Sequence, residues 1–172
     1  MSVMKTVSWR CAALVVGGAL LIAPACGGAE PKQVGAKKVE TLDPSVVPAE
    51  LQGLKVSPEE IGGATEVKSP FVEKVGLFSL RQGELLQGTL QVSTFAANAD
   101  SEKSRFRLSV VQQIGSTVPK PYRMGDRTVY LTAGKRQSIA VWFEGRHFFV
   151  LSTRDDFGQP RALLRSALEI KL

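Results

Sequence analysis

Histidine and cysteine are the scarcest functional residues in this sequence. Its 172 residues include one histidine, His147, and two cysteines, Cys11 and Cys26. A zinc site needs three or four nitrogen, sulfur or oxygen ligands, so here it would have to consist mostly of carboxylates. We therefore expect no metal and no other cofactor. With so few cysteines, the chain must also fold without a framework of disulfides.

Motifs for nucleophilic catalysis are missing as well. His147 could in principle act as a base for Ser138 or Ser152, with Asp155 as the acid of a triad. Neither serine lies in a nucleophile motif. We expect His147 to be a partly exposed residue of a strand, and we assign no catalytic residue.

Two other motifs resemble binding loops only superficially. Gly134-Lys135-Arg136 lacks the upstream glycine and the following serine or threonine of a phosphate loop, so it is interpreted as a hairpin turn. Asp155 and Asp156 are adjacent carboxylates, but a calcium loop needs several oxygen ligands at set intervals. An ordinary loop is the simpler interpretation of this pair.

No uncharged apolar run is long enough for a transmembrane helix. The longest, residues 11–25, holds fifteen residues and contains Gly17, Gly18 and Pro24, whereas a membrane-spanning helix needs about 20. Lys5 and Arg10 precede it without any acidic residue. A basic head before a short apolar body is typical of a secretory signal, so we predict a signal peptide over residues 1–25.

Small residues end this segment directly before a cysteine. Ala25-Cys26-Gly27 resembles the end of a bacterial lipoprotein signal, while Ala23-Pro24-Ala25 also fits ordinary signal cleavage, and both predict a cut before Cys26. Removal of the signal leaves Cys26 as the only cysteine, which cannot form an internal disulfide. The resemblance implies a lipid on Cys26 and a protein anchored on the outer side of the bacterial cell membrane. A soluble secreted protein and an uncleaved anchor remain the alternatives.

The exported chain is mildly basic and begins with a linker. Without the signal it has 20 Lys and Arg against 16 Asp and Glu, a net charge of +4. Such a surplus aids solubility and is compatible with a position near anionic head groups. The basic residues are scattered among acids, so we expect no nucleic-acid partner. Residues 26–50 are rich in glycine, proline and charge and predict a flexible tether, with a globular domain over residues 51–172.

Hydrophobic periodicity predicts the elements of the domain. Residues 51–70 are expected to be irregular, with one helical turn beginning at Ser57 and Pro58. We expect an α+β fold: a single domain with an antiparallel sheet of five to six strands and helices packed on one face. The predicted elements are strands at residues 71–80, 86–92, 128–132, 138–143 and 147–153, and helices at residues 101–114 and 160–168, the first capped by Asp100 or Ser101.

Aromatic residues concentrate in the strands that we place at the centre of the sheet. Neighbouring strand residues project to opposite faces, so one face would lie under the helices and the other would need a cover. The group could form a surface for an apolar ligand or a protein partner, or loops and residues 51–70 could cover it. Its members are Trp142, Phe143, Phe148 and Phe149.

The order of these elements resembles a known family. A three-strand meander with a Val141-Trp142-Phe143 centre, followed by a helix at residues 160–168, is similar to the PsbP-like fold of exported lipoproteins such as the LpqN-like group. The resemblance implies an envelope-facing binding or assembly module and no catalytic residue. Our main hypothesis is therefore a non-enzymatic envelope lipoprotein that binds a protein partner or an apolar ligand near the membrane. The alternatives are a small secreted hydrolase that uses His147 and a structural spacer.

Overall fold

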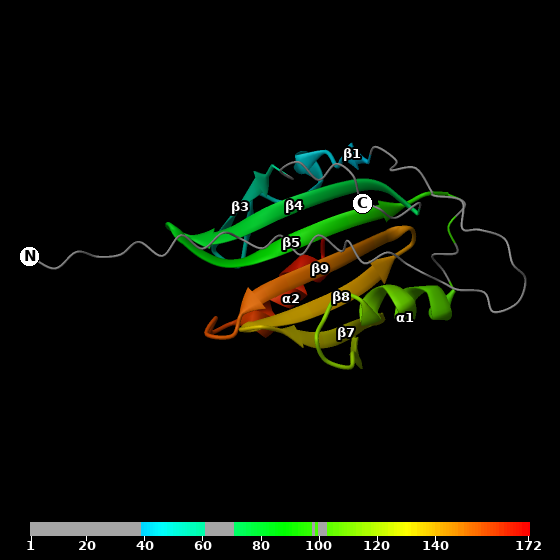
Figure 1. Cartoon of the computed structure of the whole chain (residues 1–172). Helices are drawn as coiled ribbons and strands as arrows, with labels where there is room; N and C mark the ends of the chain where they lie inside the picture. Colours follow the sequence, from blue (N-terminus) through cyan, green and yellow to red (C-terminus); the bar gives the residue numbers. More distant parts are fainter. Residues whose placement is uncertain (1–38, 61–70, 98, 100–102) are drawn as a thin grey trace, which may run out of the picture.

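The computed structural model describes residues 39–60, 71–97, 99 and 103–172. The predicted signal peptide, Cys26 and the first part of the tether therefore lie outside the described residues. The elements, in chain order (Figure 1), are β1 Glu40–Thr41, the 3-10 helix η1 Pro44–Val46, β2 Glu50–Leu51, β3 Leu54–Glu59, β4 Val72–Gln82, β5 Leu85–Phe95, α1 Ser104–Gln112, β6 Lys120–Met124, β7 Arg127–Gly134, β8 Gln137–Glu144, β9 His147–Arg154 and α2 Pro160–Leu168.

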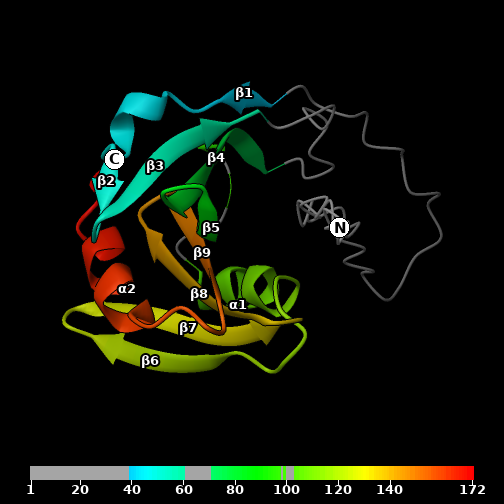
Figure 2. The same ribbon diagram turned by 90° about the vertical axis from the view of Figure 1, so that its left-hand side faces the viewer.

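In the described part of the chain, nine strands form one sheet. Its order is β2-β3-β4-β5-β9-β8-β7-β6, and β1 pairs with β4 beyond the end of β3. All neighbours are antiparallel except β1 and β4. Viewed from the end in Figure 2, the sheet passes from β3 and β4 at the top, through β5, β9 and β8, to β7 and β6 at the bottom. The structure is mostly β, so the predicted α+β class with five to six strands is wrong.

The helices pack on opposite faces of the sheet, which corrects the prediction of one helix-covered face. Figures 1 and 2 both show α1 on one side and α2 on the other. Successive strand residues alternate between the faces. Val141 of β8 belongs to the buried cluster that includes Val111 of α1, whereas its neighbour Trp142 belongs to the cluster that includes Leu163 of α2. Both faces at the centre of the sheet are therefore core.

The N-terminal part of the described chain is more regular than predicted. Leu42, Val47 and Leu51 are buried in the cluster that α2 completes, so residues 39–50 belong to the domain and not to a flexible tether. Ser57 and Pro58 lie in β3 and not in a helical turn. Pro58 is accommodated because the short β2 pairs only with the first residues of β3, which leaves the rest of β3 at an edge.

Most of the remaining elements confirm the predictions. The hairpin of β4 and β5, the meander of β7, β8 and β9, and both helices occur near the predicted positions. Lys103 occupies the N-cap position of α1 without a side-chain capping bond, and the predicted caps at positions 100 and 101 lie outside the described residues. Strand β6 was missed because Pro119, Pro121 and Gly125 favour a loop.

Candidate functional site: the exposed edge at β6

The aromatic group predicted as a binding surface is divided between the two cores. Trp142 and Phe149 are cross-strand partners on the α2 face, and their rings stack with centroids 4.9 Å apart and an interplanar angle of 2°. Both side chains are fully buried. They fill the space between the sheet and α2 and are therefore not available to a partner.

The other two aromatic residues lie on the α1 face. Phe148 is buried and stacks on Phe95 at 4.9 Å between ring centroids, and Phe106 of α1 contacts Phe95 edge-on at 5.0 Å. Phe143 is half-buried, with the guanidinium of Arg107 5.3 Å from the centre of its ring. The four aromatic residues therefore form two structural clusters instead of one ligand surface.

His147 lies at the end of the β8–β9 hairpin, away from the serines considered for catalysis. Its Nδ1 is 3.0 Å from the hydroxyl of Thr94. Burial and, next, the charge of Arg146 lower the pKa of His147, while Glu144 opposes the shift. Ser152 is five positions further along β9, which corresponds to about 17 Å in a strand. The histidine and this serine are not brought together.

Ser138 and Asp155, the other serine and the acid considered for a triad, lie together at the opposite end of the hairpin. The hydroxyl of Ser138 donates a hydrogen bond to Asp155 at 3.3 Å. Ser138 pairs with Thr153, whereas His147 pairs with Glu144, six positions along β8, so the two sites are about 20 Å apart. The geometry therefore provides no triad from these residues.

The other motifs considered for binding have structural partners. Lys135 and Arg136 form the predicted tight turn between β7 and β8, although the positive φ, 60°, is at Arg136 and not at Gly134. Asp156 accepts two hydrogen bonds from Arg154, which lower the pKa of this carboxyl. Across the described ranges, no three His, Cys, Asp or Glu side chains are grouped to hold a metal ion.

Exposed apolar residues concentrate around α1, β6 and β7. The large hydrophobic residues of the described chain that are exposed include four from this region and two from elsewhere, Leu85 and Leu172. The exposed fractions of the four are 84% for Val118, 52% for Tyr122, 42% for Leu108 and 38% for Leu131. Leu108 and Leu131 lie in elements that the sequence predicted. Sequence reasoning missed the exposed strand between them, because it took the segment with Pro119, Pro121 and Gly125 for a loop.

Strand β6 combines these apolar residues with cations. Tyr122 pairs with the buried Val129, and Lys120 pairs with Leu131. Because alternate residues share a face, Lys120, Tyr122 and Leu131 extend one face of the sheet beyond its core into solvent. Arg123 projects from the other face and is also exposed. We call this set, together with the preceding Val118, the β6 rim.

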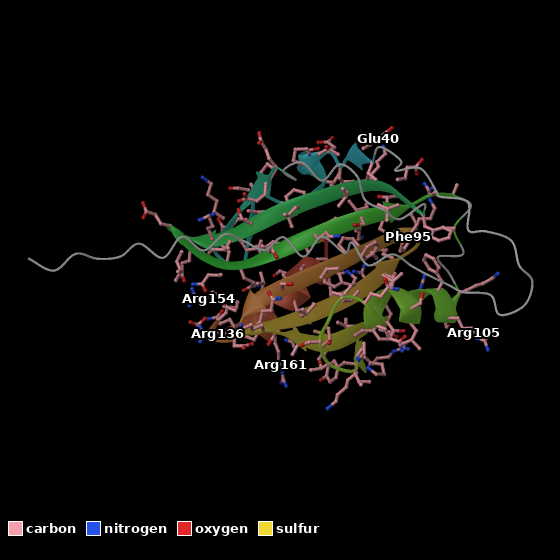
Figure 3. The ribbon with its side chains drawn as sticks, in the orientation of Figure 1. Glu40, Phe95, Arg105, Arg136, Arg154 and Arg161 are labelled. Atoms are coloured by element: carbon pink, nitrogen blue, oxygen red, sulfur yellow. The ribbon has the colours of Figure 1, made fainter. Side chains whose placement is uncertain are left out.

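Charge is distributed unevenly over the two halves of the sheet. The described residues up to position 99, which include β1 to β5, have three basic and seven acidic side chains, a net charge of −4. Residues 103–172 have thirteen basic and five acidic side chains, a net charge of +8. In Figure 3, Glu40 lies on the β1 side, whereas Arg105, Arg136, Arg154 and Arg161 lie towards the half of the sheet that contains β7. The β6 rim belongs to the basic half.

The comparisons with known proteins give no family for the chain. Neither the models of known families, nor curated proteins, nor solved structures give a significant match. Among the residues that the structure describes, neither helix has the length and apolarity needed to cross a membrane.

Proposed function

We propose that this protein is a non-enzymatic lipoprotein of the bacterial cell envelope. It is anchored on the outer side of the cell membrane by a lipid on Cys26, and its domain binds a partner near that membrane through the β6 rim. The observation that carries the proposal is the exposure of the three apolar residues of the β6 rim, Val118, Tyr122 and Leu131. Exposed apolar clusters of this kind mark interaction sites on otherwise polar surfaces.

The packing of the sheet favours binding at an edge over binding in an apolar interior site. Each face at the centre of the sheet is closed by one helix, with Val111 from α1 and Leu163 from α2 fully buried. An apolar ligand would have to displace one of these helices. A partner at β6 needs no such rearrangement, because the first four residues of this strand are already exposed.

Separation of His147 from both serines supports a role without catalysis. The hydrolase hypothesis requires a base within hydrogen-bond reach of its nucleophile, and the strand register separates His147 from Ser138 by six residue positions. We therefore do not carry that alternative further. The resemblance to PsbP-like lipoproteins stays a prediction.

Intact-mass measurement of the protein from its native membrane tests the anchor. We expect a chain that begins at Cys26 with the added mass of a diacylglyceryl group, and we expect a Cys26→Ser variant to lose this increment. An unmodified chain beginning at Cys26 in the soluble fraction would contradict the anchor and indicate a secreted protein.

A further inference from the structure

We propose that the partner of the β6 rim is the bilayer itself: the rim lies against the anionic head groups of the membrane that holds the lipid anchor. This inference rests on the proposed function and specifies its binding surface. Lys120 lies on the same sheet face as the exposed ring of Tyr122, and Arg123 projects from the opposite face of the same edge. Basic residues attract anionic lipids, and an amphipathic aromatic side chain is favourable at the level of the head groups.

The chemistry of β6 disfavours addition of a partner strand. The strand has only five residues, and Pro121 has no N–H to donate. Lys120 and Arg123 place positive charge on both faces of this edge. Short length, proline and charge are the features by which edge strands avoid pairing. A surface that contacts side chains fits β6 better than a peptide that needs its backbone.

A second copy of the chain is also a poor occupant of this edge. Antiparallel self-pairing of β6 would gather the two cations of each copy, Lys120 and Arg123, in one short ladder, and β6 contains no acid to offset them. Neither cation forms an ion pair with a carboxylate in the described part of the chain. An extended anionic plane is complementary to both.

The difference in charge between the two halves of the sheet also orients the β6 edge of the domain towards the membrane. A negatively charged membrane attracts residues 103–172, with their net charge of +8, and repels the β1 to β5 half, with its net charge of −4. Both effects turn the β6 edge towards the membrane and β1 away from it. The apolar members of the rim then add contact with the boundary of the acyl chains.

The chain between Cys26 and the domain is long enough for this orientation. Val39, the first described residue, is thirteen residues after Cys26, and thirteen residues span at most roughly 45 Å when extended. The first strand, β1, pairs with β4 on the side away from β5, so it lies six strand spacings from β6 in the sheet order, or about 29 Å. A lipid on Cys26 can therefore reach the membrane while β6 rests on it.

Vesicle binding by the protein without its lipid tests the inference. The exported Cys26→Ser protein is mixed with vesicles of phosphatidylglycerol and phosphatidylcholine, or of phosphatidylcholine alone, and bound protein is measured by sedimentation. We expect binding only to the anionic vesicles, weakening as salt is raised. The variant Lys120→Gln/Arg123→Gln should bind roughly 30-fold more weakly, since each basic residue near the surface contributes about fivefold.

A matched pair of substitutions separates this face from general charge attraction. Lys55→Gln/Lys74→Gln removes two exposed cations from the acidic half, where the ion pair of Lys74 with Glu40 at 3.4 Å is on the surface. Charges further from the membrane than the Debye length of about 10 Å are screened, so this control should bind like the parent. Equal losses in the two pairs would overturn the assignment of the β6 rim.

Loss of the apolar residues of the rim should affect vesicle binding with a different salt dependence from loss of its cations. Val118→Ser/Tyr122→Ser should weaken binding at high salt as well as at low salt, because burial of apolar surface is not screened. Absence of binding to anionic vesicles would overturn the inference and leave a protein as the partner of this edge. Because the test protein has no lipid, either result is independent of the intact-mass test of the anchor.

Discussion

The burial of both sheet faces can be tested with one kind of substitution at three valines. Val92 of β5 belongs to the α2-side cluster and Val141 of β8 belongs to the α1-side cluster, and neither is exposed. Val118 is 84% exposed. Replacement of each by alanine removes the same atoms from the two faces of the sheet and from the surface.

The expected losses follow from the burial of these side chains. Valine to alanine removes two carbon atoms, each worth about 0.8 kcal/mol when buried, and a cavity adds to this loss in a packed core. We therefore expect Val92→Ala and Val141→Ala each to lower the free energy of unfolding by roughly 2 to 3 kcal/mol. Val118→Ala should change it by less than about 0.5 kcal/mol.

Urea unfolding followed by tryptophan fluorescence measures these differences. Trp142 is the only tryptophan after residue 25, and its stacking on Phe149 makes its emission a reporter of the folded sheet. If Val92→Ala or Val141→Ala were as mild as Val118→Ala, the face on which that valine lies would not be core. The packing of one helix on each face would then be wrong.

Two further predictions concern close contacts and pH. Gly88→Ala should destabilise the protein by roughly 1 to 3 kcal/mol in urea unfolding, because the added Cβ would lie 2.3 Å from the carbonyl oxygen of Ser152. At Gly158 an added Cβ meets open space, so Gly158→Ala should be nearly neutral. Equal effects of the two substitutions would contradict the close approach of β5 and β9. The pKa of His147 is lowered below 6.5 on folding, so the unfolded chain binds more protons and the stability should fall as the pH drops through 6.5 towards the folded pKa. Urea midpoints measured at about pH 8 and about pH 5 give the pH dependence of the stability, and His147→Gln should remove the part that His147 contributes. The same pH dependence in the variant and the parent would contradict the lowered pKa of His147.

The centre of the sheet could be predicted because its sequence signals agree with each other. Alternation from Leu86 to Val92 marks a strand with one polar face, and Gly145 occupies a turn that requires a positive φ. In β8 and β9, by contrast, consecutive residues are apolar and both faces are buried. Such runs specify strands but do not show which helix covers which face, so the position of α1 could not be derived.

The edges of the sheet gave weaker signals. Strands β1 and β2 have two residues each, too few for any period to appear. In the sequence, Pro58 and Pro121 favour turns, yet each lies in a strand at an edge of the sheet. At an edge, the missing backbone N–H removes no hydrogen bond to a neighbouring strand. The candidate surface at β6 was missed for this reason, because exposure of Tyr122 depends on the pairing of β6 with β7.

Burial of both faces restricts where this domain can recognise anything. Once α1 and α2 close the centre of the sheet, the surfaces left for recognition are the edges, the turns and the outer sides of the helices. The two ends of the sheet then differ in charge: the end at β1 to β3 is acidic, and the end at β6 is basic with exposed apolar side chains. An anionic plane attracts one end and repels the other, so in the proposed contact with a membrane the same charges provide the attraction and determine which end faces the surface.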